Sequence, residues 1–122
     1  MSDVPYFAYG SNLSRERMAR RCPGAALLGT ARLAGHRFVI NRRGYATVVP
    51  EPGATVYGVL WDLSETHGAL LDRYEGVEQG LYRREPCRVE PVAGGRPVDA
   101  WLYVAADRAP GTPRSGYLDL IL

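Results

Sequence analysis

The sequence contains no lysine, and all fifteen of its basic residues are arginine. Thirteen acidic residues leave a net charge of only +2, and the arginines are scattered along the chain. A phosphate backbone requires a basic patch or stripe, so we expect no nucleic-acid partner. A basic partner surface would explain arginine in place of lysine, and so would a codon preference for GC-rich triplets, which we favour.

Long apolar runs are also missing. A membrane-spanning helix needs about 20 apolar residues in succession, and the longest runs here are only a few residues. The first ten residues have neither an apolar signal core nor a basic leader. The sequence therefore predicts no membrane association and a cytoplasmic protein.

Cysteine and histidine are scarce. Cys22 and Cys87 lie far apart without metal or redox spacing, and His36 and His67 are the only histidines. These are too few candidate ligands for a zinc site, and a structural disulfide is unusual in a cytoplasmic chain. We expect free thiols, no metal and no cofactor.

The composition is that of a globular domain. Apolar residues make up 46 % and charged residues 23 % of the 122 positions, both typical of folded proteins. No repeat, linker or low-complexity tract divides the chain. We therefore expect one domain over residues 1–122.

Two helices are marked by serine N-caps. Ser14 precedes a helix over 15–21, which Pro23 and Gly24 end. Ser64 precedes a second helix, in which Glu65 favours the positive end of the helix dipole and Gly76 forms the C-terminal cap. A last helix is expected from Ser115.

Strands dominate the rest of the chain, and we interpret the fold as α+β with a curved or barrel-like mixed sheet. The cluster Pro50, Pro52 and Gly53 is expected to separate two strands. Pro86 and Pro91 favour an edge position for the strand that contains them. The expected strands are 4–9, 27–41, 45–49, 55–63, 81–92 and 98–104.

A first candidate site is the turn Tyr9-Gly10-Ser11-Asn12-Leu13, between a strand and a helix. Glycine allows backbone to approach a ligand closely, and successive N–H groups at such a turn bind anions or a developing oxyanion. A turn that is merely rich in turn-forming residues explains the same pattern. No glycine-rich phosphate motif accompanies it.

A second candidate is Glu75, in the last turn of the second helix. The negative end of the dipole disfavours its charged form, and Leu71, Tyr74 and Val77 are expected to surround it with apolar atoms. Both effects raise the pKa of a carboxyl group toward values useful for proton transfer at neutral pH. The alternative is an exposed glutamate beside a glycine cap.

The remaining aromatic residues have simpler explanations. Tyr82 and Tyr117 are candidates for a pocket wall, although most tyrosines are half-buried packing residues. Trp61 and Trp101 lie at strand positions and are expected in the core. Ser11 lacks the glycine-flanked elbow of a nucleophilic serine, so a serine triad is not predicted.

Taken together, the motifs resemble those of the γ-glutamylcyclotransferase family. Each motif is weak alone, but their order along nearly the whole chain is specific. They are Tyr6-Phe7-Ala8-Tyr9-Gly10-Ser11-Asn12-Leu13, Glu16-Arg17, Gly44-Tyr45-Ala46-Thr47, Pro52-Gly53, Val56-Tyr57-Gly58-Val59-Leu60-Trp61, Leu71-Asp72, Glu75-Gly76-Val77, Gly80-Leu81-Tyr82 and Ser115-Gly116-Tyr117.

The resemblance implies a small mixed β-barrel with flanking helices, and cofactor-free conversion of small γ-glutamyl amines to 5-oxoproline and a free amine. The family's catalytic glutamate corresponds to Glu75. Proton transfer then requires the turn and the end of the second helix to meet in one cleft. The corresponding substrate-binding residues are Tyr6, Tyr9, Gly10, Ser11, Asn12, Tyr82 and Tyr117.

The chain departs from the family in stopping five residues after Tyr117, where relatives continue with a longer helix. We expect one pocket wall to be open or supplied by a partner, and a homodimer is one such arrangement. A γ-glutamyl group on a biosynthetic intermediate, a non-catalytic small-molecule-binding module and an RNA-binding domain remain as alternatives. Intact Glu75 argues against the binding module.

Overall fold

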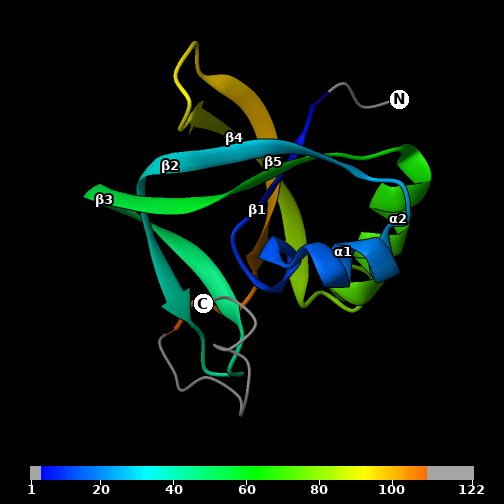
Figure 1. Ribbon diagram of the computed structural model, residues 1–122. Helices are drawn as coiled ribbons and strands as arrows, with labels where there is room; N and C mark the ends of the chain where they lie inside the picture. The colour runs from blue at the N-terminus through cyan, green and yellow to red at the C-terminus, as the bar shows by residue number, and fades with distance from the viewer. Residues whose placement is uncertain (1–3, 110–122) are drawn as a thin grey trace.

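The computed structural model describes residues 4–109. It is a closed five-stranded barrel with two helices at one side (Figure 1). Around the barrel the strands follow the order β1-β3-β2-β4-β5. The elements are β1 (Tyr6–Ala8), η1 (Ser11–Leu13), α1 (Arg15–Arg21), β2 (Ala26–Ile40), β3 (Ala46–Asp62), α2 (Glu65–Tyr74), β4 (Tyr82–Pro91) and β5 (Val98–Ala105).

The expected mixed barrel is confirmed. Strand β1 is antiparallel to β3 and parallel to β5, where Tyr6 pairs with Trp101. The other pairs, β2 with β3, β2 with β4 and β4 with β5, are antiparallel. Closing a sheet in this way leaves β1 with a neighbour on each side, so the short strand that leads into the candidate turn is held firmly.

The separation of 45–49 from 55–63 into two strands was wrong, because β3 runs continuously from Ala46 to Asp62. The proline-glycine cluster is absorbed as an irregularity in the ladder. Pairing with β2 passes from His36–Pro50 directly to Ala34–Thr55. Such bulges bend a strand and increase its twist, which suits a strand that must curve around a barrel.

The edge position expected for β4 was only partly right. In a closed barrel β4 has two neighbours, and Pro86 pairs with Trp101 of β5. In the described ladder the pairing with β2 consists of Ala31–Pro91 and Arg32–Glu90. A strand with so short a second contact tolerates proline, which cannot donate a backbone hydrogen bond.

Both helices begin at the predicted serines. The side chain of Ser14 accepts a hydrogen bond from the Arg17 N–H. Ser64 forms a capping box with His67, whose Nδ1 accepts from the Ser64 N–H while its Nε2 lies 2.7 Å from the Pro23 carbonyl. His67 therefore ties α2 to the segment that follows α1.

Two apolar clusters pack on opposite faces of β1. Phe7 and Tyr9 point into the barrel and belong to the interior cluster, which contains residues of all five strands. Tyr6 and Ala8 point outward and belong to the helix-side cluster, between the barrel and the helices. The alternation follows from the two-residue period of a strand. The helix-side cluster consists of Tyr6, Ala8, Met18, Cys22, Trp61, Leu71, Trp101 and Tyr103.

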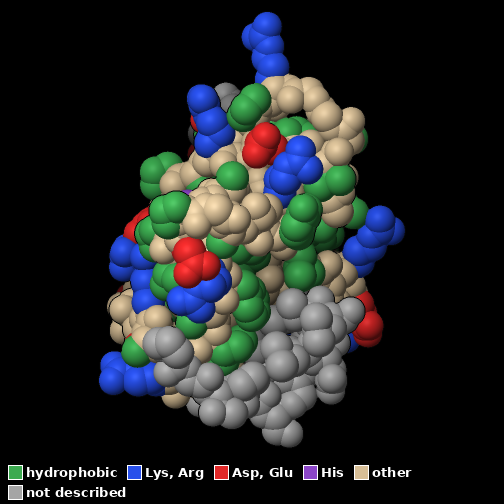
Figure 2. Space-filling model, turned by 90° about the vertical axis from the view of Figure 1, so that its left-hand side faces the viewer, with side chains coloured by type: hydrophobic (Ala, Val, Ile, Leu, Met, Phe, Trp, Pro, Cys, Tyr) green, Lys and Arg blue, Asp and Glu red, His purple; other side chains and the backbone are tan. Residues whose placement is uncertain are grey.

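Several further sequence expectations concern the core, the surface and the chain end. Trp61 and Trp101 are buried, as predicted, and Cys22 and Cys87 are free thiols. Figure 2 shows basic and acidic side chains interspersed over the visible face. Among the described residues, no helix is long and apolar enough to cross a membrane. The helix expected from Ser115 lies outside the described residues.

Candidate active site

Asn12 is the centre of the candidate site. It lies in η1, directly after β1, and its side chain is almost fully buried. The indole Nε1 of Trp61 donates to the Asn12 carbonyl at 3.2 Å, and the Leu13 N–H donates to the Gly10 carbonyl at 3.0 Å. These two hydrogen bonds fix the backbone of the turn and hence the position of the Asn12 amide.

The Asn12 amide joins β1 to α2. Its Nδ2 donates to the Tyr6 hydroxyl at 2.9 Å and lies 3.4 Å from Oε1 of Glu75, although 63 positions separate Asn12 from Glu75. The structure therefore brings together the turn and the helix end that the sequence analysis singled out separately.

The end of α2 determines where Glu75 lies. Glu75 is the C-cap, and its N–H donates to the Leu71 carbonyl at 2.8 Å. Gly76 then reverses the chain with φ +65°, and the Val77 N–H returns to the Asp72 carbonyl. A glycine in the left-handed region is a usual way to end a helix, and here it leaves Glu75 facing η1 rather than continuing the helix.

Burial raises the pKa of Glu75 to about 7. The positive charge of Arg21 lowers the pKa of Glu75 by favouring the carboxylate, and the like charge of Asp72 raises it further. A carboxyl group with this pKa is present in both protonation states near neutral pH. Burial and the nearby Glu75 also raise the pKa of Tyr6 well above its usual value, so its hydroxyl stays protonated.

The apolar surroundings expected for Glu75 are only partly present. Leu71 is fully buried and Val77 packs against the helix-side cluster, but Tyr74 is 60 % exposed. The ring of Tyr74 instead lies under the guanidinium of Arg21, whose Cζ is 4.9 Å from the ring centroid. Tyr74 was therefore wrongly expected to enclose the carboxyl group.

Sequence reasoning missed Arg21 and Asp72. Nη1 of Arg21 donates to Oδ1 of Asn12 at 2.5 Å. Asp72 precedes Glu75 by three helical positions, a spacing that places two side chains on one helix face, and so could have been noticed. Arg21 carries no comparable signal, because its contact with Asn12 depends on the turn between β1 and α1.

Asp72 is itself held in a network on the flank of α2. Its Oδ1 accepts from Nε of Arg84 at 2.8 Å and from the Tyr103 hydroxyl at 2.7 Å. The Arg84 guanidinium also lies over the ring of Trp101, with Cζ 4.1 Å from the ring centroid. This network fastens α2 to β4 and β5 and so supports the position of Glu75.

Tyr9 and Tyr82 donate hydrogen bonds to backbone carbonyls of the barrel strands. The Tyr9 ring is in the interior cluster and its hydroxyl donates to the Tyr103 carbonyl. The Tyr82 hydroxyl donates to the Ala46 carbonyl at 2.5 Å. Gly10 and Ser11 contribute the backbone of the turn, and Tyr117 lies outside the described residues.

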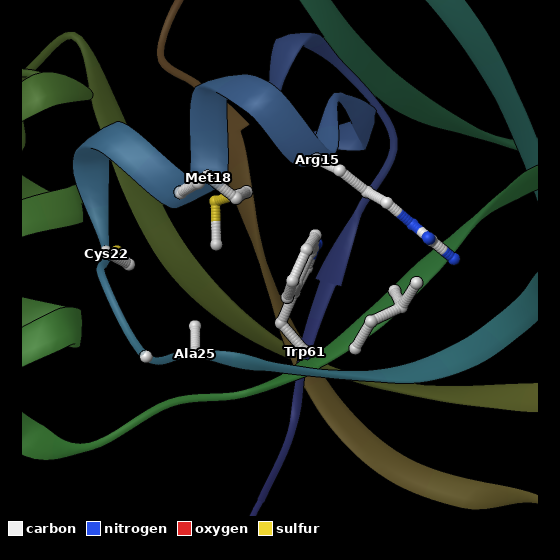
Figure 3. A pocket seen from close by; sticks show the side chains of 8 residues that line it. Arg15, Met18, Cys22, Ala25 and Trp61 are labelled. Atoms are coloured by element: carbon white, nitrogen blue, oxygen red, sulfur yellow. The ribbon is translucent and has the colours of Figure 1, made fainter.

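A separate cavity of about 390 Å³ lies beside α1 (Figure 3). Met18 of α1 and Cys22, the residue that follows α1, face Ala25 and Trp61 across it, and the side chain of Arg15 extends along its rim. Its lining includes neither Asn12 nor Glu75. Across residues 4–109, no group of three or more histidine, cysteine, aspartate or glutamate side chains could hold a metal ion.

Comparison with known proteins identifies the family. Residues 6–119 match the family described as gamma-glutamyl cyclotransferase, AIG2-like, so the chain belongs to this family. Over 87 residues it is 38 % identical to a human gamma-glutamylcyclotransferase and 37 % identical to a bovine one. These matches cover 63 % of this chain and 46 % of each relative, so the chain matches slightly less than half the length of these enzymes.

A solved structure of a gamma-glutamyl cyclotransferase has the same fold. It superposes with a TM-score of 0.88 at 30 % identity, over 97 % of this chain and 75 % of that chain. Both the sequence and the barrel with its helices therefore match this family.

Proposed function

We propose that the protein is a γ-glutamylcyclotransferase, which converts a small γ-glutamyl amine or γ-glutamyl amino acid to 5-oxoproline and a free amine. The observation that carries the proposal is the contact of Asn12 with Glu75. Burial raises the pKa of this glutamate to about 7. The names of the relatives agree with this activity.

The reaction is an internal aminolysis. The α-amino nitrogen of the substrate attacks its own γ-carbonyl carbon and forms the lactam C–N bond, and the original γ-amide C–N bond breaks. Ionised Glu75 takes a proton from the attacking nitrogen and, once protonated, gives it to the leaving nitrogen. A group with a pKa near 7 can perform both steps at neutral pH, and such transfer contributes about 10²–10⁴-fold in rate.

The turn after β1 is suited to hold the oxyanion of the tetrahedral intermediate. In a 3₁₀ helix each N–H bonds three residues back, so the N–H groups of Ser11 and Asn12 have no acceptor within η1. One of these N–H groups belongs to Asn12 and the other to the residue before it, and the Asn12 side chain contacts Glu75. A donor aimed at an oxyanion contributes about 3–4 kcal/mol to transition-state stabilisation.

Tyr6 is suited to orient the substrate. Its hydroxyl oxygen accepts from Asn12, and its hydrogen is not used in that bond. Because its raised pKa keeps it neutral, it can donate to a carbonyl or carboxylate of the substrate. Holding nitrogen and carbon close enough to react removes much of the entropic part of the barrier.

The test is turnover of a substrate panel. The wild-type chain and Glu75→Gln are incubated with γ-glutamyl dipeptides and γ-glutamyl amines, and 5-oxoproline is measured by mass spectrometry. We expect release from at least one substrate, and a fall of about 10²-fold or more in Glu75→Gln, because the amide keeps the shape but cannot carry the proton. Substrate binding without release by the wild-type chain would contradict the proposal and indicate a binding module.

A further inference from the structure

Arg21 is the charged residue that contacts the site from α1. Its Nη1 donates to Oδ1 of Asn12 at 2.5 Å, and its guanidinium lies over the ring of Tyr74, the residue before Glu75. Arg21 therefore contacts Asn12 through a hydrogen bond and Tyr74 through the face of the tyrosine ring.

A guanidinium group has five N–H donors and no acceptor. The Asn12 atom that faces Arg21 must therefore be the carbonyl oxygen, and the NH₂ group must point the other way. In that orientation the NH₂ group reaches the Tyr6 hydroxyl and Glu75 Oε1. With Arg21 absent, the amide could turn over and present its oxygen to the Glu75 carboxylate, which would repel it.

We propose that Arg21 is a positioning residue for the Glu75 proton carrier, which it orients through the Asn12 amide and keeps available as a carboxylate by its positive charge. This inference rests on the proposed function, because it assigns Arg21 a part in the same reaction. Arg21 acts through other residues and need not touch the substrate.

Two charged groups and one neutral hydroxyl, from three elements, lie around Glu75. Arg21 on α1 favours the carboxylate, Asp72 on α2 disfavours it, and the Tyr6 hydroxyl on β1 is neutral. Oδ1 of Asp72 also accepts hydrogen bonds from Arg84 and Tyr103. Loss of Arg21 leaves the effects of burial and Asp72 unopposed, so the pKa of Glu75 should rise further.

The experiment compares Arg21→Gln and Arg21→Lys with Arg20→Gln as the matched control. Arg20 is on the same helix, but its side chain is 66 % exposed and pairs with Glu16 at 3.3 Å. Each chain is assayed for kcat and kcat/KM against pH, and the Glu75 carboxyl is titrated by ¹³C NMR without substrate.

In Arg21→Gln, we expect the acidic limb of kcat/KM and the Glu75 titration to move up by about one pH unit, a usual effect of an adjacent opposite charge. Arg21→Lys should keep much of the midpoint, because it keeps the charge. Its kcat should fall, because an ammonium lacks the planar fork that fixes the amide. Arg20→Gln should match the wild type in every measurement.

An unmoved acidic limb and titration in folded Arg21→Gln would overturn the inference, as would wild-type kcat in both Arg21 variants. If Arg21→Gln does not fold, Arg21→Lys decides, since wild-type kcat there refutes the orienting role. Failure of the proposed function is distinguishable, because it removes 5-oxoproline release from the wild-type chain. The NMR titration still reports whether Arg21 controls the Glu75 carboxyl.

Discussion

Two buried asparagines show how a structural region of this barrel differs from its candidate active site. Asn41, after β2, bonds to backbone groups: Oδ1 accepts from the Arg43 and Tyr45 N–H groups, and Nδ2 donates to the Asp107 carbonyl. Asn12 bonds through its side chain to three side chains, Tyr6, Arg21 and Glu75. The two amides are equally buried.

The difference lies in what each amide holds in place. Asn41 closes the turn between β2 and β3 and fastens it to the chain after β5, a use of asparagine typical of turns. Asn12 holds ionisable side chains that come from β1, α1 and α2. Removing ionisable groups from water, even in part, costs free energy and is not needed for the stability of a barrel. We interpret this departure from a local rule as a sign of function.

The largest effect of the candidate site should appear in the pH dependence of the free energy of unfolding, when the wild type is compared with Glu75→Gln. Burial raises the pKa of Glu75 from 4.5 to about 7, so between these pH values the native chain binds more protons than the unfolded chain. The free energy of unfolding should therefore fall as the pH rises from about 4.5 to 7, by at most about 3 kcal/mol. Urea unfolding of the wild type and Glu75→Gln across this range measures it, and Glu75→Gln should lack this part of the fall. Parallel curves for the two chains would contradict the assignment.

Removing the Asn12 side chain should lower turnover. Asn12→Ala deletes the contact with Glu75 and leaves the Tyr6 hydroxyl and Arg21 without that partner. We expect kcat to fall about 10- to 100-fold, since a hydrogen bond to a charged group contributes about 1.5–3 kcal/mol. Steady-state kinetics with 5-oxoproline detection checks this, and an unchanged kcat would show that the contact has no part in the reaction.

The same substitution at Asn41 should act on stability instead. Asn41→Ala leaves two N–H groups and a carbonyl without their side-chain partner, and we expect a loss of about 1–3 kcal/mol in the free energy of unfolding. The folded variant should keep kcat within a few-fold of the wild type. Chemical denaturation and kinetics on the same preparation measure both. A kcat loss as large as that of Asn12→Ala would erase the distinction between the two regions.

A smaller effect is expected at the glycine that ends α2. In Gly76→Ala, the new Cβ would lie 2.8 Å from Cδ1 of Leu81, and φ is +65°. Gly80→Ala is the matched control, because φ is +77° but nothing lies within 4 Å of its Cβ. We expect both to lose about 1 kcal/mol of stability from the left-handed backbone, with a further loss and a lower kcat only in Gly76→Ala. Equal effects in thermal unfolding and kinetics would show that the contact with Leu81 is unimportant.

Much of the local structure was predictable because its causes are local. Ser14 and Ser64 marked the starts of the helices, and the predicted range 15–21 agrees with α1. The break expected at Pro50 and Pro52 failed for a nonlocal reason, since pairing with β2 holds β3 together across its irregularity. Closure of the barrel was implied by the family resemblance and could not be derived from periodicity.

The site was predictable only in part. The pattern around Glu75 indicated a raised pKa, and burial accounts for most of it. The expectation that Tyr9 binds substrate followed the motif, but strand alternation sends its ring into the barrel and leaves Tyr6 on the helix side. The contact of Arg21 with Asn12 could not be found from the sequence, because it depends on the turn between β1 and α1.

The most direct test of the account is the titration of the Glu75 carboxyl in the wild-type chain. Comparison of ¹³C NMR spectra with those of Glu75→Gln identifies its signal, and the chemical shift is followed from pH 3 to 9. The account predicts a midpoint of about 7, because burial raises the pKa of this carboxyl group. A midpoint near 4.5, the ordinary value for a glutamate, would contradict it.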